Sequence, residues 1–317
     1  MQYRPLGRTG LKVSPLCLGT VNFSQRTTEE DSFKIIHRAL DEGINFVDTA
    51  NIYGKGGRAE TVVGKALKGR RDGVVLATKV RGQIGDGPND SGLSRRHILS
   101  AVEDSLHRLQ TDHIDLYQLH SPDPDTPMEE TLSALTDLVR SGKVRYIGTS
   151  NYAAWQIAHA HGLSALNGWE RFVSEQPEYR LIESQIDTEL LPFAQNHGVS
   201  IQPYSPMAGG LLSGRYRTDD PKPAGSRRDV EYWMPSPDRI DARLGLVEKL
   251  TGLAADAGTS LSQLARAGVC GRPGVTSPIV GPRTMEHLED NLAALSVEIP
   301  EDVLRTIDEW IPSGSLA

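Results

Sequence analysis

Residues 74–120 hold one complete repeat of the pattern that decides the fold. The apolar run VVLATKV (74–80) is followed by the amphipathic stretch SRRHILSAVEDSLHRLQ (94–110) and by a second apolar run, IDLYQLH (114–120). Both apolar runs are largely continuous, which is typical of parallel strands covered on both faces. Between them, apolar residues from Ile98 to Leu109 keep helical spacing. The segment therefore predicts a strand, a helix and a second strand parallel to the first.

The same alternation extends in both directions along the chain. The eight candidate strands are Leu16–Gly19, Asn45–Ala50, Val74–Val80, Ile114–His120, Val144–Asn151, Phe172–Glu175, Ser200–Pro206 and Thr276–Pro282. Eight units in one series, without a break into halves, favour a closed (β/α)8 TIM barrel, and an open doubly wound sheet is the alternative. We expect residues 1–317 to form a single domain.

Three segments lie outside this repeat. Tyr3–Val13 reads as a small hairpin that caps the bottom of the barrel. Met207–Ile240 is rich in Gly, Pro, Asp and Arg and predicts a long loop after the seventh strand, on the face where barrel enzymes carry their sites. Glu301–Trp310 predicts a last helix outside the barrel, and Thr27–Glu30 predicts a capping box at the start of the first barrel helix.

Composition narrows the class of protein. The chain has 317 residues, 38% of them hydrophobic, and a net charge of −7, which disfavours nucleic acid as a partner. No apolar run reaches the length of a membrane span, and the amino-terminal residues contain no apolar signal segment. Cys17 and Cys270 form neither a disulfide framework nor a metal site. We expect a cytoplasmic protein without a membrane partner or a bound metal.

Polar residues at the ends of three neighbouring candidate strands form one chemical set. Asp48 lies near the end of the second strand and is followed by Tyr53, Lys79 lies near the end of the third, and His120 ends the fourth. A phenol is a poor proton donor at neutral pH, but an ammonium close by lowers its pKa, and a carboxylate keeps a buried ammonium charged. An imidazole can donate a hydrogen bond to a substrate oxygen. The set therefore suits protonation of a forming alkoxide.

Competing catalytic motifs are missing from the sequence. It contains no HExxH, no GxSxG, no P-loop and no GxGxxG fingerprint. A nicotinamide cofactor, if one binds, does not bind as in a Rossmann fold.

Several linked motifs resemble those of the aldo-keto reductase family. They are NFVDTA (45–50) with Tyr53-Gly54, Thr78-Lys79, QLH (118–120), YIGTSN (146–151), YSPMAGGLLSG (204–214) and PIVG (278–281), and the resemblance runs from Leu6 to Leu295. It implies a (β/α)8 barrel that binds extended NADPH and reduces a small carbonyl substrate. Tyr53 would then be the proton donor, Asp48 and Lys79 would tune it, and His120 would orient the carbonyl.

The resemblance also implies a set of residues that bind the cofactor. Ser150, Asn151 and Gln176 match positions at the nicotinamide carboxamide, Tyr204 stacks on the ring, and Thr20 lies near it. Further matches are Ser205, Pro206, Met207 and Arg215 along the pyrophosphate, and Gly281, Arg283, His287, Asp290 and Asn291 at the adenosine end.

The adenosine end also has a physical reading that does not depend on the family. Arg283 is expected at the start of the helix after the last strand, where a guanidinium and free backbone N–H groups together suit a phosphate. The sequence departs from the family here: His287 stands where Gln is frequent, Asp290 where Glu is usual, and residues 265–271 replace a more apolar helix segment.

Two other functions stay open beside carbonyl reduction. One is a cofactor-binding regulatory subunit of a membrane channel, since potassium-channel β subunits resemble this family; they commonly depart from it at the position of His120. The other is a different barrel enzyme, such as a phosphosugar isomerase. Neither the carbonyl substrate nor an oligomeric state is indicated by the sequence.

Overall fold

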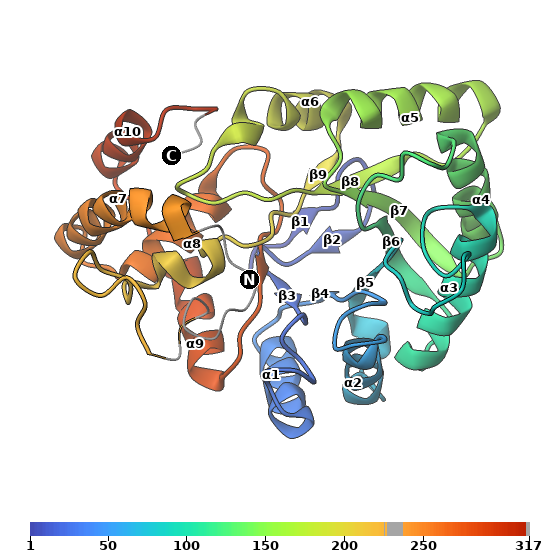
Figure 1. Ribbon diagram of the computed structural model, residues 1–317, viewed down its shortest axis with the longest axis horizontal. Helices are drawn as coiled ribbons and strands as arrows, with labels where there is room; N and C mark the ends of the chain where they lie inside the picture. Colours follow the sequence, from blue (N-terminus) through green and yellow to red (C-terminus); the bar gives the residue numbers. More distant parts are fainter. Residues whose placement is uncertain (225, 227–236, 315–317) are drawn as a thin grey trace.

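An eight-stranded parallel sheet forms the centre of the computed structural model, which describes residues 1–224, 226 and 237–314. The strands follow one another around the sheet in the order β10-β3-β4-β5-β6-β7-β8-β9 (Figure 1). Their bounds are β3 Cys17–Gly19, β4 Phe46–Asp48, β5 Val75–Val80, β6 Ile114–Leu119, β7 Val144–Ser150, β8 Phe172–Gln176, β9 Ser200–Ile201 and β10 Ile279–Val280.

Backbone hydrogen bonds join the two ends of this sheet. Thr276 N donates to Ile201 O at 2.8 Å, and Ile279 N donates to Pro203 O at 2.8 Å. The chain around β9 thus meets the chain that leads into β10, and the predicted barrel is confirmed against the open sheet.

The last two strands are shorter than predicted. Ser200–Pro206 and Thr276–Pro282 were each expected as seven-residue strands, but β9 and β10 contain two residues apiece. Prolines at positions 203, 206, 278 and 282 have no N–H to donate, so they interrupt a regular ladder.

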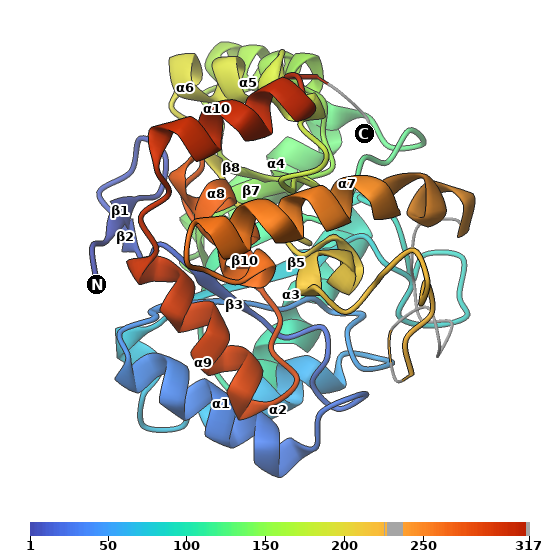
Figure 2. The ribbon, with the colours of Figure 1, turned by 90° about the vertical axis from the view of Figure 1, so that its left-hand side faces the viewer.

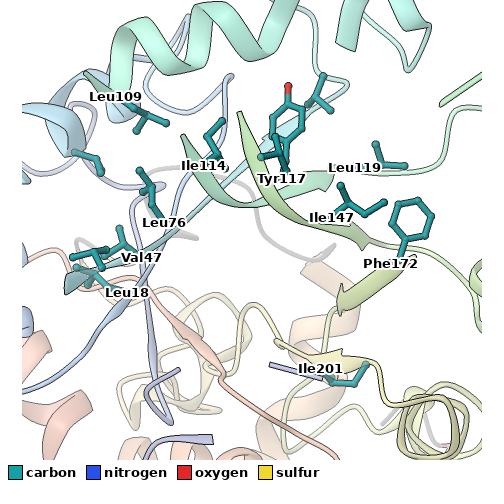
Figure 3. Packing of buried hydrophobic residues seen from close by; sticks show 14 of the residues in the cluster. Leu18, Val47, Leu76, Leu109, Ile114, Tyr117, Leu119, Ile147, Phe172 and Ile201 are labelled. Atoms are coloured by element: carbon teal, nitrogen blue, oxygen red, sulfur yellow. The ribbon is translucent and has the colours of Figure 1, made fainter. Parts of the chain in front are cut away.

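Ten α-helices surround the barrel among the described residues (Figures 1 and 2). They are α1 Glu29–Asp41, α2 Arg58–Ala66, α3 Arg95–Leu109, α4 Met128–Arg140, α5 Ala154–Asn167, α6 Leu190–His197, α7 Pro237–Asp256, α8 Leu261–Gly271, α9 Met285–Ala293 and α10 Glu301–Trp310. Figure 3 shows the packing between sheet and helices: Leu18, Val47, Leu76 and Tyr117 belong to one buried cluster with helical residues such as Leu109.

The alternate residues of the strands form a second cluster inside the barrel. Cys17, Phe46, Val75 and Leu116 pack there with Leu6 and Val13. Val13 belongs to β2 (Lys12–Val13), and Leu6 directly follows its antiparallel partner β1 (Arg4–Pro5), so the predicted hairpin fills the bottom of the barrel. The opposite end, at the carboxyl termini of the strands, stays open for a site.

Two local predictions need correction. The first barrel helix is capped by Thr28, whose Oγ1 accepts a hydrogen bond from Asp31 N at 3.1 Å, one residue later than the predicted capping box at Thr27–Glu30. The predicted loop Met207–Ile240 contains a 3-10 segment, Ala208–Ser213, and α7 already begins at Pro237. Residues 225 and 227–236 of that loop lie outside the described residues. None of the described helices has both the length and the apolar composition to cross a membrane.

Candidate active site

Strand alternation places three polar side chains inside the barrel. Val47 and Leu76 point outward to the helices, so Asp48 on β4 and Lys79 on β5 point inward, as does Gln118 on β6. Asp48 and Lys79 are 2% and 0% exposed. Apolar packing below them and the strands around them leave these side chains little freedom.

Lys79 is the centre of a tight polar cluster. Its Nζ lies 2.5 Å from Asp48 Oδ2, donates to Thr49 O at 2.9 Å and to Tyr53 Oη at 3.3 Å. Burial alone would lower the pKa of Lys79, but Asp48 and Tyr53 outweigh that effect and raise the pKa above its usual value. The lysine is therefore charged at neutral pH and directly contacts the phenol.

The other oxygen of Asp48 is held by two amides. Gln118 Nε2 donates to Oδ1 at 3.0 Å, and Gln176 Nε2 donates to the same atom at 2.9 Å. With Lys79 on Oδ2, the buried carboxylate has three donors, which offset the cost of removing it from water. Its position is fixed before any ligand arrives.

His120 faces Tyr53 across the open end of the barrel. The two rings are 5.7 Å apart between centroids and nearly perpendicular, at 80°. Burial, and then the charges of Lys79 and Arg81, lower the pKa of His120 to about 3. The imidazole is therefore neutral at physiological pH, and Tyr53 and His120 can each offer a donor to one oxygen atom between them.

Asn151 connects this cluster to the opposite wall. Its Nδ2 donates to His120 O at 3.0 Å, and its Oδ1 accepts from Tyr204 Oη at 2.9 Å. The residue has a φ of +61°, a left-handed conformation that side chains other than glycine seldom adopt. Such strain persists where the surrounding structure fixes it, frequently at ligand sites.

One cavity of about 770 Å³ runs from this cluster to α9. All fourteen residues that the sequence predicts as cofactor contacts lie on its wall; they are Thr20, Ser150, Asn151, Gln176, Tyr204, Ser205, Pro206, Met207, Arg215, Gly281, Arg283, His287, Asp290 and Asn291. Asp48, Tyr53 and His120 line the same cavity, whereas Lys79 lies behind them. We call the group Asp48, Tyr53, Lys79 and His120 the tyrosine end of the cavity.

The other end is built on α8 and α9, and we call Arg266, Arg283, His287 and Asp290 the arginine end. Arg283 was predicted to start the helix after the last strand. It instead precedes Thr284, the N-cap of α9, by one residue. Thr27 Oγ1 donates to Arg283 O at 3.2 Å, which ties this loop to the start of α1. The predicted proximity of Arg283 to a helix N-terminus holds with this shift.

Asp290 has less freedom than the sequence suggests. Its carboxylate accepts hydrogen bonds from Ser262 Oγ at 2.9 Å and Gln263 Nε2 at 3.2 Å, and it pairs with Arg266 Nη1 at 2.7 Å. These donors all come from α8, and Ser262 and Arg266 line the cavity as well.

Several residues of the site are absent from the sequence predictions. Arg266 lies in residues 265–271, whose sequence indicates only a departure from a more apolar helix segment, and Ser262 lies just before them. Gln118 was quoted within a motif but given no role, although it holds Asp48. Glu175 was included in a predicted strand, and its carboxyl accepts from Tyr152 N at 3.1 Å behind the cavity wall. Period-two alternation would have found Gln118, because it lies two residues before His120 and so shares its face of the strand.

The described part of the loop after β9 closes one side of the cavity. Gly209, Gly210, Ser213 and Arg215 line it, and Arg215 Nη2 donates to Ala224 O at 2.6 Å. A loop of this kind can cover a ligand held along its length.

Comparisons with known proteins give a consistent set of relatives. The family model described as "Aldo/keto reductase family" matches residues 15–312. An uncharacterized oxidoreductase of Bacillus subtilis, YrpG, is 43% identical over 98% of this chain and 96% of its own. A probable voltage-gated potassium channel subunit beta of Arabidopsis thaliana is 37% identical over 94% and 92%, and the versiconal hemiacetal acetate reductase of Aspergillus parasiticus is 34% identical over 99% and 98%.

Proposed function

Because this chain belongs to the aldo/keto reductase family, we propose that it is an NADPH-dependent oxidoreductase that reduces an aldehyde or ketone to an alcohol. The observation that carries the proposal is the contact between Lys79 Nζ and Tyr53 Oη, 3.3 Å long, at the inner end of a large cavity. A phenol beside an ammonium whose pKa is raised is suited to giving up its proton near neutral pH.

The residues of the tyrosine end have distinct tasks in this proposal. Tyr53 protonates the carbonyl oxygen as negative charge develops on it, and Lys79 stabilises the phenolate that remains. Asp48 keeps Lys79 charged and in place. His120, neutral because of burial, donates a second hydrogen bond to the same oxygen and so orients the carbonyl carbon. The carbonyl carbon would take its hydride from a reduced nicotinamide held in this cavity.

The wall of the cavity fits a nicotinamide dinucleotide in its donor set. Ser150 and Asn151 line the cavity with a hydroxyl and an amide, and Tyr204 offers an aromatic face held by its hydrogen bond to Asn151. At the far end, Arg283 lies next to the start of α9, where a phosphate is favoured by both charge and helix dipole. A volume of about 770 Å³ lies within the usual range of cofactor sites.

The test is a panel of aldehydes and ketones assayed by loss of NADPH absorbance. We expect turnover of some carbonyl compounds by the wild-type protein and tighter binding of NADPH than of NADH. If neither NADPH nor NADH binds in a direct titration, the proposal is contradicted.

The second candidate is a cofactor-binding subunit of a membrane channel. It is favoured by the 37% identity to the plant protein named as a potassium channel β subunit. All four residues of the tyrosine end are present, and the rings of His120 and Tyr53 lie 5.7 Å apart between centroids, which favours a catalytic function instead. Gel filtration separates the two: a tetramer that binds NADPH but turns over none of the panel would favour the channel subunit.

A further inference from the structure

Arg266 is a buried arginine in the middle of α8. Its neighbours Leu264, Ala265 and Ala267 are buried apolar residues, and Arg266 itself is 7% exposed. Burying a guanidinium is costly unless its donors find partners, because the charge loses its water. A residue of this kind calls for a reason beyond packing.

The partners of Arg266 satisfy only one side of its guanidinium. Nη1 contacts Asp290 Oδ2 at 2.7 Å and donates to Ser262 O at 3.1 Å. Nε is buried and has no hydrogen-bond partner. Because Arg266 lines the cavity, the anchored guanidinium keeps donor capacity that a ligand can use.

Positive charge exceeds negative charge around this point. Arg283 lines the same end of the cavity, with Arg215 on the loop beside it. Burial, and then the charges of Arg283 and Arg266, lower the pKa of His287, so its imidazole adds no charge at neutral pH. Burial, and then the charges of Arg26 and Arg215, lower the pKa of Arg283. Within the part of the chain that the structure describes, Asp290 is the one carboxylate on this stretch of wall, and no carboxylate pairs with Arg283. The chain as a whole carries −7, so the local excess is not a general property of its surface.

We propose that Arg266 is a specificity-determining residue that shares the 2′-phosphate of NADPH with Arg283. The inference rests on the proposed function and adds a second guanidinium, from α8, to the one predicted from the sequence. Asp290 acts on the protein rather than on the adenosine: with Ser262 and Gln263 it orients Arg266. A phosphate dianion needs more than one cation to be neutralised, and a planar guanidinium donates to two of its oxygens at once.

The experiment uses fragments of the cofactor, so it does not depend on turnover. Adenosine 2′,5′-bisphosphate and 5′-AMP are titrated calorimetrically into wild type and Arg266→Met, which keeps an unbranched apolar stem and removes the charged guanidinium. We expect the bisphosphate to bind about 10- to 100-fold more weakly to the variant, while 5′-AMP changes by less than about threefold. Arg266→Lys should recover part of the loss.

Two further variants separate a phosphate contact from a structural one. Arg266→Met leaves Asp290 without its cation, so the double variant Arg266→Met/Asp290→Asn removes both charges and should show the same loss. Asp290→Asn alone keeps Arg266 but loses the carboxylate that orients it, so this variant should bind the bisphosphate more weakly than wild type but more tightly than Arg266→Met. Equal weakening of both fragments by Arg266→Met, or equal loss in Asp290→Asn and Arg266→Met, would overturn the inference. If wild type bound neither NADPH nor the bisphosphate, the proposed function itself would fail instead.

Discussion

The two ends of the cavity differ in the secondary structure that carries their residues and in how their charges are paired. The tyrosine end is mounted on strand ends inside the barrel, and its charges are paired at distances fixed by neighbouring strands. The arginine end is mounted on helix α8 and the start of α9, and of its two arginines only Arg266 is paired with a carboxylate among the described residues. The first arrangement sets protonation states, and the second leaves positive charge for a ligand to neutralise.

The two ends also differ in how strongly dissolved salt screens their charges. Lys79 and Asp48 are sealed from water, so their effect on Tyr53 is not weakened by salt. Arg283 is half-buried and His287 exposed, so screening weakens whatever they bind. Variants at the two ends should therefore differ in which kinetic constant they change and in how far salt alters the result.

The largest effect is expected for Tyr53→Phe. The variant keeps the ring and removes the proton, so kcat should fall by about 10²–10⁴-fold, the usual contribution of a general acid. NADPH affinity, measured by quenching of tryptophan fluorescence, should stay near that of wild type. More than a tenth of wild-type kcat in the variant would rule Tyr53 out as the donor.

Lys79→Met should act through Tyr53 and not on the cofactor. Without the ammonium the pKa of the phenol rises, so the alkaline limb of the kcat profile should move to higher pH while kcat near pH 7 falls by about 10- to 100-fold. Removing one partner of a buried pair also destabilises the fold. The double variant Asp48→Asn/Lys79→Met is the matched control, since it carries no lone buried charge. A profile of unchanged shape in both would make Lys79 structural.

The tyrosine end was the more predictable of the two from sequence. Strand ends in a parallel barrel meet at one face, so Asp48, Lys79 and His120 could be brought together from their places in three apolar runs. Arg266 could not, because nothing in the pattern of residues 265–271 says which face of the helix meets a cavity. Two adjacent threonines made Thr27 and Thr28 indistinguishable as caps. The single domain over residues 1–317 and the roles of the site residues stay predictions.

Arg283→Ala tests the arginine end, where the expected effect is on cofactor affinity and not on kcat. Loss of a charge-assisted contact to the 2′-phosphate should weaken NADPH by about 10- to 150-fold, with NADH nearly unchanged and kcat at saturating NADPH within a factor of a few. Because the residue is half-buried, the ratio of NADPH to NADH affinity should shrink as salt is raised in wild type. Equal weakening of both cofactors would place Arg283 on the shared adenosine. A wild type that already prefers NADH would contradict the assignment without any variant.

The smallest effect on activity is expected at Glu175, which supports the tyrosine end from behind. Its carboxyl is fully buried, Oε1 accepts from Tyr152 N at 3.1 Å, and Oε2 is buried without a partner. Burial raises its pKa to about 8, and the hydrogen bond from Tyr152 N offsets only part of that effect. Glu175 is therefore a neutral carboxyl at pH 7, and it holds the turn in which Asn151 adopts its left-handed conformation.

The pH dependence of stability follows from this shift. An unfolded glutamate has a pKa of about 4.3, so between that value and about 8 the folded state binds the extra proton, and stability falls as pH rises through this range. Glu175→Gln keeps the shape of the group and cannot lose a proton. Its melting temperature, relative to wild type, should rise by several degrees from pH 5 to pH 8, while kcat and NADPH affinity at pH 6 stay within about twofold. If the difference in melting temperature between Glu175→Gln and wild type does not change with pH, Glu175 is ionised in the folded protein. A buried charge, and not a neutral carboxyl, would then lie behind the tyrosine end.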